Sequence, residues 1–153
     1  MRIICFCLGL ITSVALATPT PIDWPALTGL NTDTGEISTG VTQLIQTPIK
    51  IAGFIVPIEL GDDIATVDEF ILVSNPLACL HMPPPPPNQM IYVKMNTPIP
   101  LDMDARGVWI TGTLSIPRAQ VEYGYYGYEL NGTDASRAQI DVDELLPPIL
   151  APH

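Results

Sequence analysis

Five consecutive prolines, Pro83–Pro87, place the strongest constraint on what this chain can form. A proline run adopts an extended polyproline II helix of about 3.1 Å per residue, and its residues have no backbone N–H to donate. The residue before a proline avoids the α region, so Met82 is extended as well. We therefore expect a stiff rod directly after Cys79 and His81, the most reactive side chains of the chain.

The rest of the sequence is dominated by β-type patterns. No segment of about 12 residues or more has a convincing helical period. Runs rich in Ile, Val and aromatic residues, separated by Gly, Pro and Asp, predict five strands. These strands are Ile49–Leu60, Val67–Val73, Gln89–Met95, Gly107–Ile116 and Tyr123–Gly132.

Two glycines inside these runs, Gly53 and Gly112, suggest bends in the strands. Five short, bent strands favour a mainly β fold, a small five-stranded barrel that is OB-like; a β-sandwich is the alternative. The helix expected between strands three and four of an OB fold is missing, because Asn96–Arg106 is short and contains Pro98 and Pro100.

The N-terminus has the order of a secretory signal peptide. Arg2 precedes the apolar run Ile3–Ala17, which is shorter than the roughly 20 residues that span a membrane. The run ends in Ala15-Leu16-Ala17, an A-x-A cleavage signature. We therefore expect an exported, periplasmic protein with a signal peptide (1–17, cleaved near Ala17), an N-terminal extension (18–48) and a β-rich domain (49–153).

Two short stretches of the extension have local signals. Asp23 is placed to cap a helical turn from Trp24 to Leu27, which tolerates Pro25 in its first turn. The stretch "TGVTQLIQ" (39–46) is ambiguous between helix and strand.

The chain is acidic, with a formal net charge of -10. Removal of Arg2 with the signal peptide subtracts one positive charge and makes it about -11. Nucleic acids and anionic membranes are bound through Lys and Arg, so we expect neither as a partner. No second apolar run is long enough to span a membrane.

Cys79 is the only cysteine of the expected mature chain, because Cys5 and Cys7 belong to the signal peptide. No internal disulfide can then form. A lone thiol is unusual in an oxidising compartment, so Cys79 is buried, metal-bound or functional, and burial alone is the simplest interpretation.

The stretches "GFIVPIEL", "FILVSNPLACLHMPPPPPNQMIYV" and "VWITGTL" resemble the family of secreted bacterial proteins called domain of unknown function 3299. The resemblance covers roughly Ile49 to Leu114 and implies export and a Cys/His site, without an established activity. The matching residues are Gly53, Phe54, Val56, Pro57, Glu59, Cys79, His81, Pro83–Pro87, Asn88 and Gln89.

We expect the extended geometry to continue back through Cys79. Cys79 and His81 would then project to the same face, with Cβ atoms about 7 Å apart, and both could reach one ion. Zinc in structural sites takes four ligands, Cys and His among them. The family pattern makes Glu59 the nearest further ligand, and a partner chain is the other source. Copper(I) suits thiolate and thioether ligands, and Met82 and Met90 flank the motif.

The expected function is a periplasmic metal-binding or metal-handling accessory protein, in which Cys79, His81 and Glu59 bind zinc or copper. The alternative is a non-catalytic interaction module that buries Cys79 and binds a protein partner. A thiol-dependent enzyme ranks third, because neither an oxyanion donor nor a third catalytic residue is identifiable.

The remaining polar and aromatic groups predict no site. The acids Asp102, Asp104, Asp141, Asp143 and Glu144 lack a calcium-loop signature and are expected to be solvated. The tyrosines Tyr123, Tyr125, Tyr126 and Tyr128 are expected in the core and at its rim. In the third strand, Met90, Tyr92 and Lys94 share one face.

Overall fold

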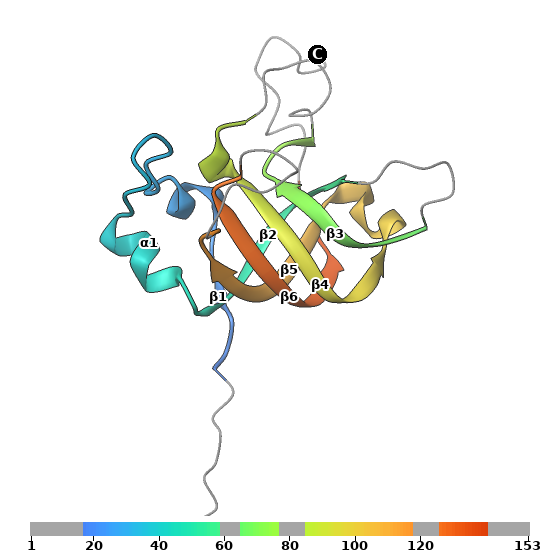
Figure 1. Ribbon diagram of the computed structural model, residues 1–153. Coiled ribbons are helices and arrows are strands. Elements are labelled where there is room, and N and C mark those ends of the chain that lie inside the picture. The colour runs from blue at the N-terminus through green and yellow to red at the C-terminus, as the bar shows by residue number, and fades with distance from the viewer. Residues whose placement is uncertain (1–16, 59–64, 77–84, 118–125, 141–153) are drawn as a thin grey trace, which may run out of the picture.

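Five strands close into a barrel in the computed structural model of the protein, which describes residues 17–58, 65–76, 85–117 and 126–140 (Figure 1). They are β2 (Pro48–Pro57), β3 (Thr66–Val73), β4 (Met90–Pro100), β5 (Val108–Ser115) and β6 (Tyr128–Arg137), and β1 (Thr20–Pro21) is added outside them. Helix α1 (Thr39–Leu44) and the 3-10 turns η1 (Trp24–Leu27), η3 (Pro87–Gln89) and η4 (Leu101–Arg106) connect them.

The barrel strands are hydrogen-bonded in the order β2-β3-β4-β6-β5, and β5 pairs back onto β2 to close the ring. Around the ring, every contact is antiparallel except that between β4 and β6. A parallel pair requires a crossover, and here the chain passes through β5 before it enters β6. The prediction of a mainly β, five-stranded, OB-like barrel is confirmed, and the described strands form one sheet rather than a sandwich.

Strand β5 shows how the period-two pattern builds the core. Val108, Ile110 and Leu114 are fully buried, Gly112 is buried on the same face, and the alternate residues Trp109, Thr111 and Thr113 are half-exposed. Each large aliphatic side chain buried in this way contributes about 1.5–3 kcal/mol. The other strands supply Ile49, Ile51, Phe70, Leu72, Ile91, Val93, Tyr128 and Leu130 to the same cluster.

The two glycines predicted at bends lie where backbones approach closely. A Cβ atom on Gly112 would lie 2.4 Å from the carbonyl oxygen of Asn131, beside a register shift between β5 and β6. A Cβ atom on Gly53 would lie 2.8 Å from Leu72 Cγ and from the carbonyl oxygen of Val73. No larger residue fits at either position without a shift of its neighbours.

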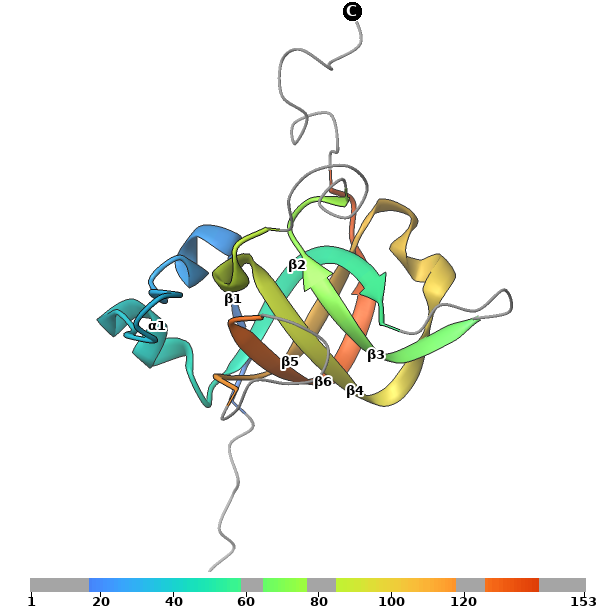
Figure 2. The same ribbon diagram turned by 45° about the horizontal axis from the view of Figure 1, so that its top comes forward.

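The N-terminal extension completes the edge of β2, on one side of the barrel (Figures 1 and 2). Strand β3 pairs with β2 only from Phe54 onward. Before that point β1 runs parallel to β2, the Ile22 N–H donates to Lys50 O at 2.9 Å, and the Trp24 indole N–H donates to Ala52 O at 2.8 Å. The extension thus satisfies backbone carbonyls that β3 leaves open.

The structure shows which local structure forms in the two short stretches of the extension, Trp24–Leu27 and 39–46. The turn capped by Asp23 is confirmed as η1, with the Ala26 N–H donating to the carboxylate at 3.3 Å. The ambiguous stretch 39–46 forms α1, because Ser38 caps it by accepting from the Val41 N–H at 3.3 Å. Leu27 and Val41 are fully buried in the barrel core, so the extension packs into the same folded unit.

The sequence predicts that the helix of an OB fold is missing between the third and fourth strands, and the structure has there only the six-residue 3-10 turn η4 and no α-helix. Pro98 and Pro100 belong to β4, which extends beyond its predicted end, so they do not interrupt the connection. The turn is held by the Leu101 N–H, which donates to Ala65 O at 3.0 Å. Among the described residues, no helix is long and apolar enough to cross a membrane.

Candidate functional site

The residues predicted to bind a metal, Glu59, Cys79 and His81, lie outside the described residues. These residues belong to two segments, 59–64 and 77–84, and the structure does describe the residues that flank each segment. The segment with Cys79 and His81 leaves the barrel after β3 and re-enters it at β4. Its two ends are neighbours, because Val73 and Met90 face each other in the β3–β4 ladder.

A second apolar cluster, called the outer cluster below, covers these strand ends. Its residues alternate with those of the core along β3 and β4, so they point to the outside of the barrel. Ile58, which directly precedes Glu59, also packs against it. The outer cluster therefore receives one described end of the Glu59 segment and the two strands that flank the segment with Cys79 and His81. The outer cluster consists of Phe54, Ile71, Val73 and Tyr126, with Val56, Ile58, Met90, Tyr92 and Ile140 packed against them.

The described end of the proline run has the expected geometry. Pro86 has φ -61° and ψ 150°, values close to polyproline II. The run then ends in η3, where the Gln89 N–H donates to Pro86 O at 2.8 Å. Pro86 thus has the backbone geometry expected for the run, Pro87 already belongs to the 3-10 turn, and Pro83 and Pro84 lie outside the described residues.

Two side-chain amides tie this end of the run to the extension. Asn88 Nδ2 donates to Leu30 O at 3.0 Å. Gln89 Nε2 donates to Trp24 O at 3.3 Å and to Asn88 O at 3.0 Å. In both views η3 lies beside η1, although more than fifty residues separate them (Figures 1 and 2). The amides therefore hold the residues that directly follow the proline run against the extension.

Gly127, just before β6, holds the same end of the run from another element. Its N–H donates to Pro87 O at 2.6 Å. A Cβ atom on Gly127 would lie 2.7 Å from both Pro87 O and Leu30 Cδ2. Only glycine permits this close contact between three segments of the chain.

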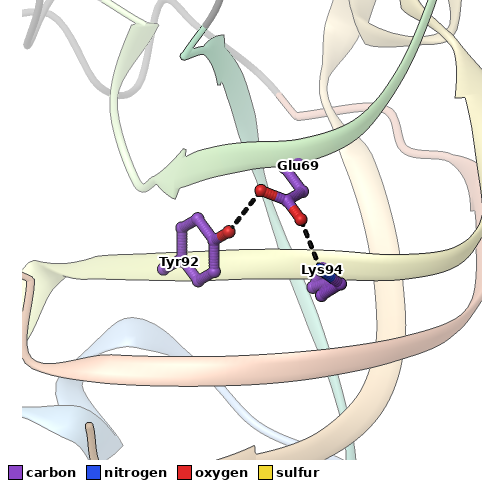
Figure 3. Close-up of polar contacts among 3 residues, drawn as sticks. All are labelled: Glu69, Tyr92 and Lys94. Atoms are coloured by element: carbon purple, nitrogen blue, oxygen red, sulfur yellow. Dashed lines mark hydrogen bonds and ion pairs between the residues drawn. The ribbon is translucent and has the colours of Figure 1, made fainter. Parts of the chain in front are cut away.

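A polar group on the same side of the sheet joins β3 to β4 (Figure 3). Glu69 and Lys94 are register partners, and Lys94 Nζ lies 2.5 Å from Glu69 Oε1. The Tyr92 hydroxyl donates to Glu69 Oε2 at 2.6 Å. The bond from Lys94, and after it the bond from Tyr92, lowers the pKa of Glu69. Both carboxylate oxygens are thus engaged in holding the two strands together.

Tyr92 stacks on Tyr126, with ring centroids 5.1 Å apart and an interplanar angle of 16°. Burial, followed by the hydrogen bond to Glu69, raises the pKa of Tyr92. Burial, followed by the charge of Glu129, raises the pKa of Tyr126 to about 12. Both phenols therefore stay neutral at physiological pH and act as packing groups.

The prediction that Tyr92 and Lys94 share one face of the strand is confirmed, but the contact of both side chains with Glu69 was not predicted. The signal is the register: Glu69 is the cross-strand partner of Lys94, and only the pairing of β3 with β4 shows this. Tyr126 and Tyr128 are buried as expected, whereas Tyr123 and Tyr125 lie outside the described residues.

Among the described residues, no group of three or more His, Cys, Asp or Glu side chains could hold a metal ion. Asp102, expected to be a solvated acid, forms an exposed ion pair with Arg137 at 3.3 Å. The acids at positions 141, 143 and 144 lie outside the described residues.

The profile of a family of proteins of unknown function, DUF3299, matches residues 31–137. The chain belongs to the DUF3299 family. The match spans all five barrel strands and ends with β6. It begins directly after Leu30, so the two carbonyls that accept from Asn88 and Gln89 lie just before the matched residues.

The fold of this DUF3299 chain is similar to the crystal structure of a DUF3299 family protein from Pseudomonas aeruginosa PAO1. The TM-score is 0.63 at 23% sequence identity, over 82% of this chain and 99% of that chain. A putative aspartyl-tRNA synthetase from Leishmania major Friedlin gives a TM-score of 0.44 at 9% identity, over 87% of this chain and 23% of that chain, and carries no argument here. No curated protein matches the sequence significantly.

Proposed function

We propose that this DUF3299 protein is an exported metal-binding or metal-handling accessory protein in which Cys79 and His81 bind zinc or copper(I). One observation supports this most. Ile58, which directly precedes Glu59, and Val73 and Met90, which lie on the two strands that flank the segment with Cys79 and His81, all belong to the outer cluster or pack against it.

The chemistry of these side chains suits a soft or borderline cation. A thiolate and an imidazole are ligands for zinc, with Glu59 or a partner chain completing the coordination. Copper(I) favours the thiolate and a thioether such as that of Met90, which packs against the outer cluster. The cysteine must lose its proton to bind, so affinity should fall as the pH falls below neutrality.

Export is part of the proposal. Strand β1 begins at Thr20, so cleavage near Ala17 would leave its pairing with β2 intact. The chain expressed in a bacterial host should be recovered from the periplasm with an N-terminus near Thr18, as read by mass spectrometry. Recovery with Met1 intact would contradict export.

The test of metal binding is titration of the reduced protein with zinc and with copper(I), followed by native mass spectrometry. We expect one cation per chain, and strongly reduced affinity in Cys79→Ser and His81→Ala with the fold retained. Glu59→Gln should weaken binding less. Glu36→Gln, on an exposed loop of the extension, is its matched control and should bind as the wild type does.

The outcome that contradicts metal binding is a wild type that takes up neither cation, or uptake that is unchanged in Cys79→Ser and His81→Ala. The alternative function, a non-catalytic interaction module that binds a protein partner, would then remain. It is favoured by the outer cluster, whose members Met90, Tyr92 and Val56 are half-exposed. In that case Cys79→Ser should cost about 1–3 kcal/mol of stability, because a hydroxyl would be buried without a good partner.

A further inference from the structure

We propose that Tyr92 and Tyr126 form an oxidative modification site, at which one-electron oxidants join the two phenol rings by a carbon–carbon bond. The site lies in the outer cluster, on the outside of the barrel. It consists of the two tyrosines and of Glu69 and Glu129, whose carboxylates lie at the two hydroxyl groups. The reaction does not involve the proposed metal ligands, so it is independent of the proposed function.

The two rings are already neighbours in the folded protein. Their centroids lie 5.1 Å apart and their planes differ by 16°, which is an offset-stacked arrangement. Tyr92 is half-exposed, so an oxidant can reach it, whereas Tyr126 is only 7% exposed. Because groups held in contact react far faster than groups that must first meet, the rings should couple with each other rather than with a second chain.

Each phenol has a carboxylate at its hydroxyl group. The Tyr92 hydroxyl donates to Glu69 Oε2 at 2.6 Å (Figure 3), and the Tyr126 hydroxyl lies 3.4 Å from Glu129 Oε1. Burial, as the main cause, raises the pKa of both phenols, so the oxidant meets neutral phenols whose protons must leave with the electrons. An ionised carboxylate accepts such a proton directly, and these two phenols are therefore primed for oxidation.

Tyr128 lacks this arrangement. Its hydroxyl donates to the carbonyl oxygen of Leu27, and an amide carbonyl is a far weaker base than a carboxylate. Tyr128 is also fully buried. We therefore expect oxidation at Tyr92 and Tyr126 in preference to Tyr128.

Two one-electron steps complete the reaction. The oxidant takes one electron from each phenol, and each hydroxyl proton passes to the neighbouring carboxylate. The two phenoxyl radicals then couple at ring carbons ortho to their oxygens, which forms the new bond. Each of these carbons loses its hydrogen as a proton, while each oxygen takes up a proton again. In total the chain loses two electrons and two protons, and the oxidant gains the two electrons.

The new bond would fasten β4 to the residues that lead into β6. These two strands are hydrogen-bonded in parallel, from the pair Ile91–Tyr128 to the pair Met95–Gly132. The covalent loop would run from Tyr92 through β5 to Tyr126. A cross-link of this kind restricts the unfolded chain, so the modified protein should unfold at a higher urea concentration than the unmodified protein.

The test oxidises the full chain with a light-activated ruthenium polypyridyl complex and persulfate. Dityrosine is read by its fluorescence and by mass spectrometry of proteolytic peptides. We expect a monomeric product lighter by two hydrogen atoms, with Tyr92 linked to Tyr126 and a yield independent of protein concentration. Tyr92→Phe and Tyr126→Phe should each abolish this product, and the matched control Tyr128→Phe should retain it.

Two further variants test the proton acceptor. Glu69→Gln should slow cross-linking several-fold, because an amide does not take up the proton of Tyr92. Lys94→Met removes the same ion pair but keeps the carboxylate, so it should react at least as fast as the wild type. Equal slowing in both variants would contradict the role of Glu69. A wild type without dityrosine, a product confined to cross-linked dimers, or a link between other tyrosines would overturn the modification site.

Discussion

The hydroxyl of Tyr128 donates a 2.7 Å hydrogen bond to the carbonyl oxygen of Leu27, across 101 positions of sequence. Both residues are fully buried. The bond joins the start of the last barrel strand to the turn η1 of the extension. It connects the barrel core to the segment that holds the proline run.

Tyr128→Phe should destabilise the protein by about 1–3 kcal/mol, because it removes the shorter of two hydrogen bonds to the carbonyl of the buried Leu27 and leaves only that from the Leu30 N–H at 3.4 Å. Urea unfolding followed by circular dichroism measures the change. Tyr126→Phe is the matched control, since that hydroxyl makes only a 3.4 Å contact with Glu129, and it should cost less. A larger loss in Tyr126→Phe would contradict the role given to Leu27 and Tyr128.

Stability should also fall at alkaline pH. Burial raises the pKa of Tyr128 to about 12, above the value of about 10 in an unfolded chain. The folded state therefore favours the neutral phenol. Its contribution is complete below about pH 10 and is lost as the pH rises toward 12, at about 1.4 kcal/mol per pH unit for this residue.

Unfolding curves from pH 9 to 11.5 test this expectation, and Tyr128→Phe should show a smaller loss over that range. In spectrophotometric titrations, the phenolate absorbance that the native wild type gains and Tyr128→Phe does not should appear near pH 12. A Tyr128→Phe variant with the same alkaline dependence as the wild type would argue against the buried phenol.

Much of the barrel was predictable because each strand buries one face. In β5 the apolar residues alternate over the whole strand, and the prediction and the structure agree within two residues at either end. The last strand was predicted at Tyr123–Gly132, but β6 runs from Tyr128 to Arg137. Its second half is polar, and it is a strand because it pairs with β5, a long-range contact that its own composition does not encode.

The candidate site was predictable in part. Local sequence indicated the rod, and Pro86 has its geometry. The roles of Asn88 and Gln89 were not predictable, because their partners Trp24 and Leu30 lie far away in the sequence. The continuation of β4 through Pro98 and Pro100 was not predictable for a related reason. A strand edge tolerates proline, and only the sheet shows that this part of β4 pairs with β3 alone.

Two glycines should respond to alanine in opposite directions. Gly112→Ala should destabilise the protein by about 1–3 kcal/mol, because its Cβ would overlap the backbone of Asn131. Gly40→Ala in α1 should stabilise it by about 0.5–1 kcal/mol, since the nearest atom, Ser38 Oγ, is 3.8 Å away and alanine is the better helix former. Thermal and urea unfolding of both variants measure this difference. Equal changes in stability in the two variants would show that the close approach of β5 and β6 at Gly112 does not restrict the side chain at that position.

The loss of folding stability at acidic pH should depend on Glu69. Its pKa in the folded protein is lowered, first by the bond from Lys94 and then by that from Tyr92. A lowered pKa stabilises the fold above the unfolded value of about 4.3, and this contribution is lost as the pH falls through the folded value. Glu69→Gln should therefore lose less stability than the wild type between about pH 5 and pH 3.

The two donors predict an order among further variants. Lys94→Met removes the larger cause of the lowered pKa, and Tyr92→Phe removes the smaller one. The acid-dependent loss should therefore decrease from wild type to Tyr92→Phe, then to Lys94→Met, and be smallest in Glu69→Gln. Urea unfolding at pH 7, 5, 4 and 3 measures the four profiles. If Tyr92→Phe flattened the profile more than Lys94→Met, the hydroxyl rather than the ammonium group would hold the charge of Glu69, and the pair between β3 and β4 would have to be reassigned.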